Sequence, residues 1–89
     1  MEQIRVAIKE PRKPLVFKDI DNDLKTLQDI VDGWIEVVPF GDMVVICDED
    51  GRLKGKEPNV KIGEIGFVGT IIIAGAGDEE FTSLPKEYR

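Results

Sequence analysis

Histidine is absent from this sequence of 89 residues. Its absence removes the commonest general acid or base, the commonest metal ligand and the usual partner of a nucleophilic serine or cysteine. A pair of carboxylates could still perform acid–base chemistry, but it would need a cleft that shifts its pKa values, and a domain this small offers little concave volume. We therefore predict a protein that is not an enzyme and that has no catalytic residue, metal site or cofactor.

Cysteine is nearly absent as well, since Cys47 stands alone and cannot form an intramolecular disulfide. It ends the apolar run that begins at Met43, so we expect it to be a small buried hydrophobe, and no histidine is present to activate its thiol. No apolar run approaches the roughly 18 residues that span a membrane, and residues 1–5 lack the apolar stretch of a signal peptide. These features predict a cytoplasmic protein without membrane contact.

Charge is unevenly distributed along the chain. The whole sequence carries a formal charge of −6, whereas residues 1–18 hold five lysines and arginines against two glutamates. The remaining residues are therefore strongly acidic and repel a phosphate backbone. We predict no direct binding to nucleic acid, while an unidentified partner protein with a basic surface is a suitable ligand.

The length and the 42% of hydrophobic residues are sufficient for a single core, so we expect one domain over residues 1–89. Apolar and polar residues alternate with the period of a half-buried strand at the start of the chain, which predicts a first strand over residues 3–9. Two prolines then break this strand, and residues 15–17 predict a short second strand. Residues 75–89 are expected to form a mobile tail whose apolar side chains can dock back.

One main helix is predicted over residues 23–32. Acidic residues that favour helix N-termini precede it, and apolar residues recur at helical spacing up to Val31. Gly33 follows, and glycine readily adopts the left-handed conformation that ends a helix. We expect the next residue, Trp34, to be buried beside this helix, whereas an exposed ring would instead be an anchor for a partner.

The second half of the chain is typical of strands. Residues 34–38 are rich in β-branched and aromatic residues and stop at Pro39, and residues 43–47 follow after a short connection with glycine, which predicts a hairpin. Residues 67–74 are the most apolar stretch and predict a central strand. The fold class is therefore α+β, with a mostly antiparallel sheet of about five strands and the main helix packed on it.

The acidic run Asp48-Glu49-Asp50-Gly51 invites comparison with a calcium-binding loop. With Gly51 at the sixth position of such a loop, the first position would be Ile46, which supplies no side-chain oxygen. A solvated hairpin turn is the better interpretation, because Asp-Gly is a common turn pair. The candidate residues for contact with a partner protein are Asp48, Glu49, Asp50 and Asn59.

The glycines between the expected strands have a structural interpretation. Gly63, Gly66 and Gly69 are spaced three apart, which does not match the pattern of a dinucleotide-binding or phosphate-binding loop. Glycine inside strands marks bulges and tight corners, and we expect that role here.

Several short motifs, spread over most of the chain, carry a resemblance to a known family. They are Leu27-Gln28, Gly33 with Trp34-Ile35-Glu36, Asp48-Glu49-Asp50-Gly51, Asn59, Gly69-Thr70 and Ser83-Leu84. With this order of elements the sequence resembles domain-of-unknown-function family 3846, whose members occur in bacterial, phage and plasmid sequences. The resemblance implies an architecture and a mobile-element setting, and it brings no reaction, ligand or catalytic residue.

Three functions from different classes follow from these observations. The first is a non-enzymatic accessory domain that acts through protein contacts. The second is an acidic mimic of nucleic acid that inhibits a host DNA-binding defence enzyme, which requires carboxylates in rows spaced like phosphates. The third is a small carboxylate-based hydrolase or ligand-binding module, which requires a pocket. The sequence does not specify the oligomeric state.

Overall fold

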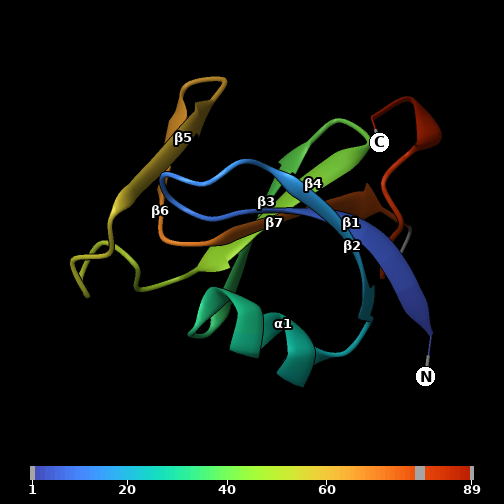
Figure 1. The fold of residues 1–89 in the computed structure, drawn as a ribbon, viewed down its shortest axis with the longest axis horizontal. Helices are drawn as coiled ribbons and strands as arrows, with labels where there is room; N and C mark the ends of the chain where they lie inside the picture. Colours follow the sequence, from blue (N-terminus) through green and yellow to red (C-terminus); the bar gives the residue numbers. More distant parts are fainter. Residues whose placement is uncertain (1, 78–79, 89) are drawn as a thin grey trace.

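An antiparallel sheet of six strands lies at the centre of the computed structural model, which describes residues 2–77 and 80–88. Its path runs β2-β1-β7-β4-β3, and the short strand β8 pairs with the end of β7 (Figure 1). The main-sheet strands are β1 (Gln3–Lys9), β2 (Val16–Asp21), β3 (Ile35–Phe40), β4 (Met43–Asp48), β7 (Ile71–Ala76) and β8 (Phe81–Thr82). The predicted α+β class with one helix on a mostly antiparallel sheet is confirmed.

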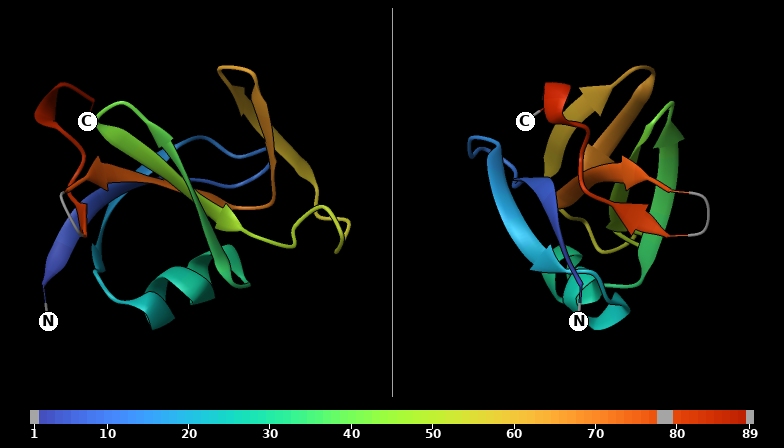
Figure 2. Two further views of the ribbon diagram at one scale, coloured as in Figure 1. Left: turned by 180° about the vertical axis from the view of Figure 1, so that it is seen from behind. Right: turned by 90° about the vertical axis from the view of Figure 1, so that its right-hand side faces the viewer.

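A second sheet of two strands packs on the first. It is a hairpin of β5 (Pro58–Ile62) and β6 (Ile65–Val68), joined across Gly63, whose φ of +61° suits a tight turn. The helix α1 (Leu24–Val31) and this hairpin lie on opposite sides of the main sheet (Figure 2). A 3-10 turn over Lys86–Tyr88 follows the last strand.

The main sheet buries apolar side chains on both faces because each face has its own cover. On the helix side the buried cluster consists of Ile4, Val6, Ile20, Leu27, Val31, Val44, Ile46, Ile72 and Ala74. On the hairpin side it consists of Val45, Cys47, Phe67 and Ile71. Successive residues of β4 therefore alternate between two cores, which explains why that strand is apolar at nearly every position.

The helix begins as predicted and ends differently. The Asp23 carboxylate accepts a hydrogen bond from the Thr26 backbone N–H at 2.8 Å, and this bond lowers the pKa of Asp23. At the other end Asp32, and not Gly33, takes the left-handed conformation, with φ of 58°. Gly33 is needed for a different reason, because a Cβ there would overlap the Asp48 carboxylate.

The first and third strands match their predictions closely. Strand β1 has the predicted bounds, and the β3–β4 hairpin forms with Val38 opposite Val45. Strand β3 runs one residue beyond Pro39, which the sequence predicts as its end. The ladder tolerates this proline because β3 lies at the edge of the sheet, where one side of the strand needs no partner.

The most apolar stretch is divided into two strands. Residues 67–74 were expected to form one strand, but Phe67 belongs to β6 and Ile71 begins β7, with Gly69 at φ +72° between them. Glycine permits this corner, and the chain crosses there from the small sheet to the large one. The predicted central position is confirmed for β7, which pairs with both β1 and β4.

The segment expected to be a mobile tail contains regular structure. Gly75 and Ala76 continue β7 and pair with β8, and Leu84 is buried as one of the side chains expected to dock. The part of this expectation that concerns Asp78, Glu79 and Arg89 lies outside the described residues. Within the described ranges, no helix is long and apolar enough to cross a bilayer.

Candidate protein-contact site

Asp48 ends β4, and its carboxylate points into the molecule. The side chain is 1% exposed and accepts hydrogen bonds from three donors. These are Lys56 Nζ at 2.7 Å, Lys54 Nζ at 2.8 Å and the backbone N–H of Asp50 at 3.0 Å. The prediction of a solvated turn is therefore wrong for Asp48, and a carboxylate buried in this way cannot contact a partner protein.

The two lysines join Asp48 to the end of the helix. Lys56 Nζ donates to the carbonyl oxygens of Val31 at 2.7 Å and Asp32 at 2.9 Å, and Lys54 Nζ donates to that of Asp32 at 3.1 Å. The last carbonyls of a helix lack intrahelical partners and carry partial negative charge, so cations stabilise them. We call Asp48, Lys54, Lys56 and these two carbonyls the Asp48 cluster.

Opposing effects set the pKa of Asp48. Burial raises it, but the hydrogen bonds from Lys54 and Lys56 and the nearby ammonium charge outweigh burial and lower the pKa from 3.8 to about 2. The same contact raises the pKa of Lys54. Asp48 is therefore ionised throughout the physiological range and serves the fold, because its charge is fully paired.

Asn59 also serves the fold. Its Nδ2 group donates to the carbonyl oxygens of Lys9 and Gly69, both at 2.8 Å, and so ties β5 to the end of β1 and to the corner before β7. Its Oδ1 atom is buried without a hydrogen-bond partner among the described residues. The amide is thus occupied by backbone groups, and the prediction that Asn59 contacts a partner gains no support from its position.

Glu49 and Asp50, the other two predicted contact residues, lie at the surface. Glu49 is exposed and Asp50 is partly exposed, and neither forms an ion pair with any residue of the described ranges. The backbone N–H of Glu49 donates to the Trp34 carbonyl at 2.8 Å, which extends the β3–β4 ladder by one pair. This pair places Glu49 across the ladder from Trp34, and Asp50 follows Glu49 in the turn.

Trp34 is exposed, and the expectation that it belongs to the core is wrong. Its exposed fraction is 67%, the largest among the aromatic residues at the surface. The helix directs Leu27 and Val31 into the core and Ile35 packs against the same core, so Trp34, the residue before Ile35 in the extended segment, points away from it. Trp34 instead borders an open hollow of about 400 Å³ that Gln28, Asp29, Asp32 and Lys54 also line.

Asp32 lines the same hollow as Trp34, Glu49 pairs with Trp34 across the ladder, and Asp50 follows Glu49 in the turn. We call Asp32, Trp34, Glu49 and Asp50 the Trp34 surface. The Asp32 side chain is 93% exposed, and its only ion pair among the described residues is a 4.0 Å contact with Lys56. Lys54 and Lys56 offset these carboxylates only in part, because both lysines also pair with the Asp48 carboxylate.

The sequence predicted Glu49 and Asp50 as contact residues, but it did not identify Asp32 and favoured a buried Trp34. The apolar stripe of the helix is already complete with Leu27 and Val31, so Trp34 is not needed to close it. Lys54 and Lys56, two residues apart after the acidic turn, could have indicated an internal ion pair. Their spacing does not identify Asp48 as the carboxylate with which they pair.

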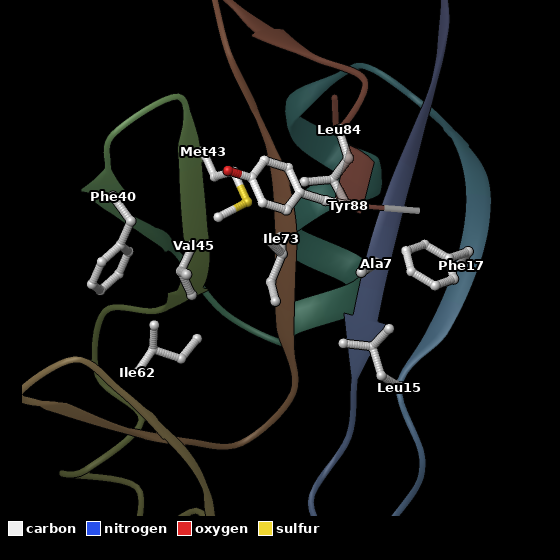
Figure 3. Close-up of a pocket in the computed structure, with 10 residues that line it drawn as sticks. All are labelled: Ala7, Leu15, Phe17, Phe40, Met43, Val45, Ile62, Ile73, Leu84 and Tyr88. Carbon is white, nitrogen blue, oxygen red and sulfur yellow. The ribbon is translucent and has the colours of Figure 1, made fainter. Parts of the chain in front are cut away.

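A second concave feature lies on the hairpin side of the sheet (Figure 3). It is an open groove of about 240 Å³, and none of the described residues that line it is charged. They are Ala7, Leu15, Phe17, Phe40, Met43, Val45, Ile62, Ile73, Leu84 and Tyr88. The volume is below the range of about 300–1,000 Å³ that small-molecule sites commonly have, and the Tyr88 hydroxyl is the one polar side-chain group present.

The described residues hold no group of three or more cysteine, aspartate or glutamate side chains placed to bind a metal ion. Cys47 is buried as expected, and burial together with the charges of Glu36 and Asp48 raises its pKa to about 11. The thiol is therefore protonated at neutral pH, which makes it a poor nucleophile.

Comparison with known proteins agrees with the resemblance drawn from the sequence. Residues 4–89 match the family model described as Domain of unknown function (DUF3846). No curated protein and no solved structure matched the chain. Since the match covers essentially the whole sequence, the chain belongs to the DUF3846 family.

Proposed function

We propose that this domain is a non-enzymatic accessory module that acts by binding another protein, and that the Trp34 surface makes the contact. The observation that carries the proposal is the exposure of Trp34, at 67%, with Asp32 lining the same hollow and Glu49 paired with Trp34 across the ladder. Tryptophan is enriched among the residues that dominate binding energy at interfaces. Its burial by a partner would remove a large apolar area from water, which favours a role in recognition.

The chemistry of the surface favours a basic segment of the partner. An arginine or lysine can lie over the face of an indole, and such contacts contribute about 0.5–2 kcal/mol depending on how far they are desolvated. Asp32, Glu49 and Asp50 would accept hydrogen bonds from the same cation or its neighbours. Arginine fits better than lysine because its planar group can stack and bind a carboxylate with two bonds.

The setting of the protein is part of the same proposal. A single buried thiol and a highly acidic chain are consistent with a cytoplasmic protein, and membership of a family resembling mobile-element products is consistent with a phage or plasmid origin. Direct binding to nucleic acid is not part of the proposal, because the overall charge of −6 opposes it.

The mimic of nucleic acid is the second candidate, and the surface carboxylates favour it. Burial of Asp48 removes one member from any row of phosphate-like charges, which leaves Asp32, Glu49 and Asp50. The two candidates differ in what the partner does, since a mimic must occupy the basic groove of a DNA-binding protein.

Affinity capture from the native host with four baits tests the proposal. The baits are the wild type, Trp34→Ala, Glu49→Lys and, as a control with the same charge change at the exposed β5–β6 turn, Glu64→Lys. We expect one protein to be retained by the wild type and Glu64→Lys and to be depleted at least about fivefold with the other two, the equivalent of about 1 kcal/mol.

Equal capture on all four baits would contradict the proposal. When a protein passes this test, a duplex DNA competitor distinguishes the two candidates. Release of the captured protein by DNA favours the mimic, whereas retention favours a contact unrelated to DNA binding.

A further inference from the structure

The helix covers only part of its side of the main sheet. It has eight residues, about 12 Å of length, whereas the sheet beneath it has five strands spaced about 4.8 Å apart. The helix does not reach the ends of β1 and β2 that are joined by residues 10–15 (Figure 1). An open hollow of about 400 Å³ is found there.

Apolar side chains form the floor of this hollow. Ile8 and Ile30 pack against the helix-side core from opposite layers, and Val16 lies directly across from Ile8 in the β1–β2 ladder. Val16 is nonetheless 54% exposed, because nothing in the described residues covers it. The apolar floor of the hollow is thus continuous with the core, as is common in ligand sites.

Basic side chains stand at its edge. Lys13 and Lys18 line the hollow together with Glu10, Pro14 and Thr70. Lys18 follows Val16 on the same face of β2, is exposed and forms no ion pair with any residue between 2 and 77 or between 80 and 88. Lys13 contacts Glu10 at 3.7 Å, a surface pair in which both side chains are more than half exposed. We call these eight lining residues the Lys18 hollow.

Charge and shape together indicate one class of ligand. We infer that the Lys18 hollow binds a small amphiphile with an apolar body and a single carboxylate, the body lying over Ile8, Val16 and Ile30 and the carboxylate facing Lys18. Two lysines against one glutamate suit a monoanion better than a dianion. The hollow also falls within the size range of small-molecule sites, whereas the uncharged groove on the other face does not.

This site is independent of the Trp34 surface. It lies at residues 8–18 with Ile30 and Thr70, and none of these residues belongs to the Trp34 surface. It also lies in a part of the chain, residues 1–18, where five lysines and arginines exceed two glutamates, which favours an anion there.

An NMR titration of the full chain with decanoate tests the inference. Decanol supplies the same apolar body without the charge, and acetate supplies the carboxylate without the body. We expect saturable shifts of Ile8, Val16, Ile30 and Thr70 signals with decanoate, at least about fivefold weaker binding of decanol, and no saturation with acetate.

Two substitutions and a control complete the test. Lys18→Met keeps most of the aliphatic stem and Lys18→Glu reverses the charge, and each should weaken decanoate binding by about fivefold or more. Lys61→Glu makes the same charge reversal at an exposed position of β5 and should change the affinity less than about twofold.

Three results would overturn the inference. Decanoate could shift the signals of Ala7, Phe17 and Ile73, which would place it in the groove on the other face of the sheet. Lys18→Glu could bind decanoate as well as Lys61→Glu does. Decanoate could also produce no saturable shift at all.

Discussion

Asp48 and its two neighbours, Glu49 and Asp50, have the same chemistry and adjacent positions but different surroundings. The Asp48 carboxylate is buried and has three hydrogen-bond donors, whereas Glu49 and Asp50 lie at the surface and form no ion pair within the described residues. The last residue of a strand can point into a core while the turn that follows points outward. Adjacent acidic residues in one run can therefore have different roles. One can stabilise the fold while its neighbours remain exposed to a partner.

Removal of the buried charge should have the largest effect. Asp48→Asn keeps the size of the side chain but removes the ion-pair partner of Lys54 and leaves Lys56, which is 16% exposed, with only its 4.0 Å contact to Asp32. Breaking a buried pair from one side costs about 3–5 kcal/mol, a large part of the free energy of unfolding of about 4–13 kcal/mol expected for a domain of this length.

Chemical denaturation checks this expectation against Asp50→Asn. Asp50→Asn removes a carboxylate from the turn two residues after Asp48 and should change the free energy of unfolding by less than about 0.5 kcal/mol. Equal losses in the two variants would show that the Asp48 cluster does not stabilise the fold.

Acid should reproduce part of this loss without a mutation. Because the pKa of Asp48 falls from 3.8 to about 2 on folding, its contribution is complete above about pH 5 and is lost as the pH falls toward 2. The fall in pKa corresponds to about 2 kcal/mol. The wild type should therefore lose about 2 kcal/mol more than Asp48→Asn between pH 6 and pH 2, as measured by denaturation at each pH.

Asp23 provides the internal reference for this experiment. Its pKa is also lowered on folding, by the hydrogen bond from Thr26, but this contribution is present in the wild type and in Asp48→Asn alike. Parallel curves for the two proteins across the acid range would mean that Asp48 is not the group responsible.

Loss of the exposed ring should have the smallest effect on stability. Trp34→Ala should change the free energy of unfolding by less than about 0.5 kcal/mol, because the indole is 67% exposed. Leu27→Ala, which empties a buried position on the preceding helix, should cost about 2–5 kcal/mol. A loss for Trp34→Ala that approaches that of Leu27→Ala, by thermal or chemical denaturation, would return Trp34 to the core.

Elements with a local signal could be predicted from the sequence, and contacts between distant elements could not. The alternation from Ile4 to Ile8 and the capping residue Asp23 act within a few residues, so β1 and the start of the helix were predictable. Asp48, in contrast, owes its burial to Lys54, Lys56 and the helix end, which meet only when the sheet is assembled. The exposure of Trp34 was also not predictable, since it depends on which side chains of the helix and sheet form the core.

The strand order of the main sheet also affects how the chain folds. The pairs β1–β2 and β3–β4 are hairpins of neighbouring segments, which close quickly because their loops are short. Among the strands of the described residues, β7 alone joins them in the sheet, with Ile73 opposite Ala7 on one side and opposite Val45 on the other. Pairing of such remote segments is slow, so the joining of the two hairpins through β7 should set the rate at which the sheet forms.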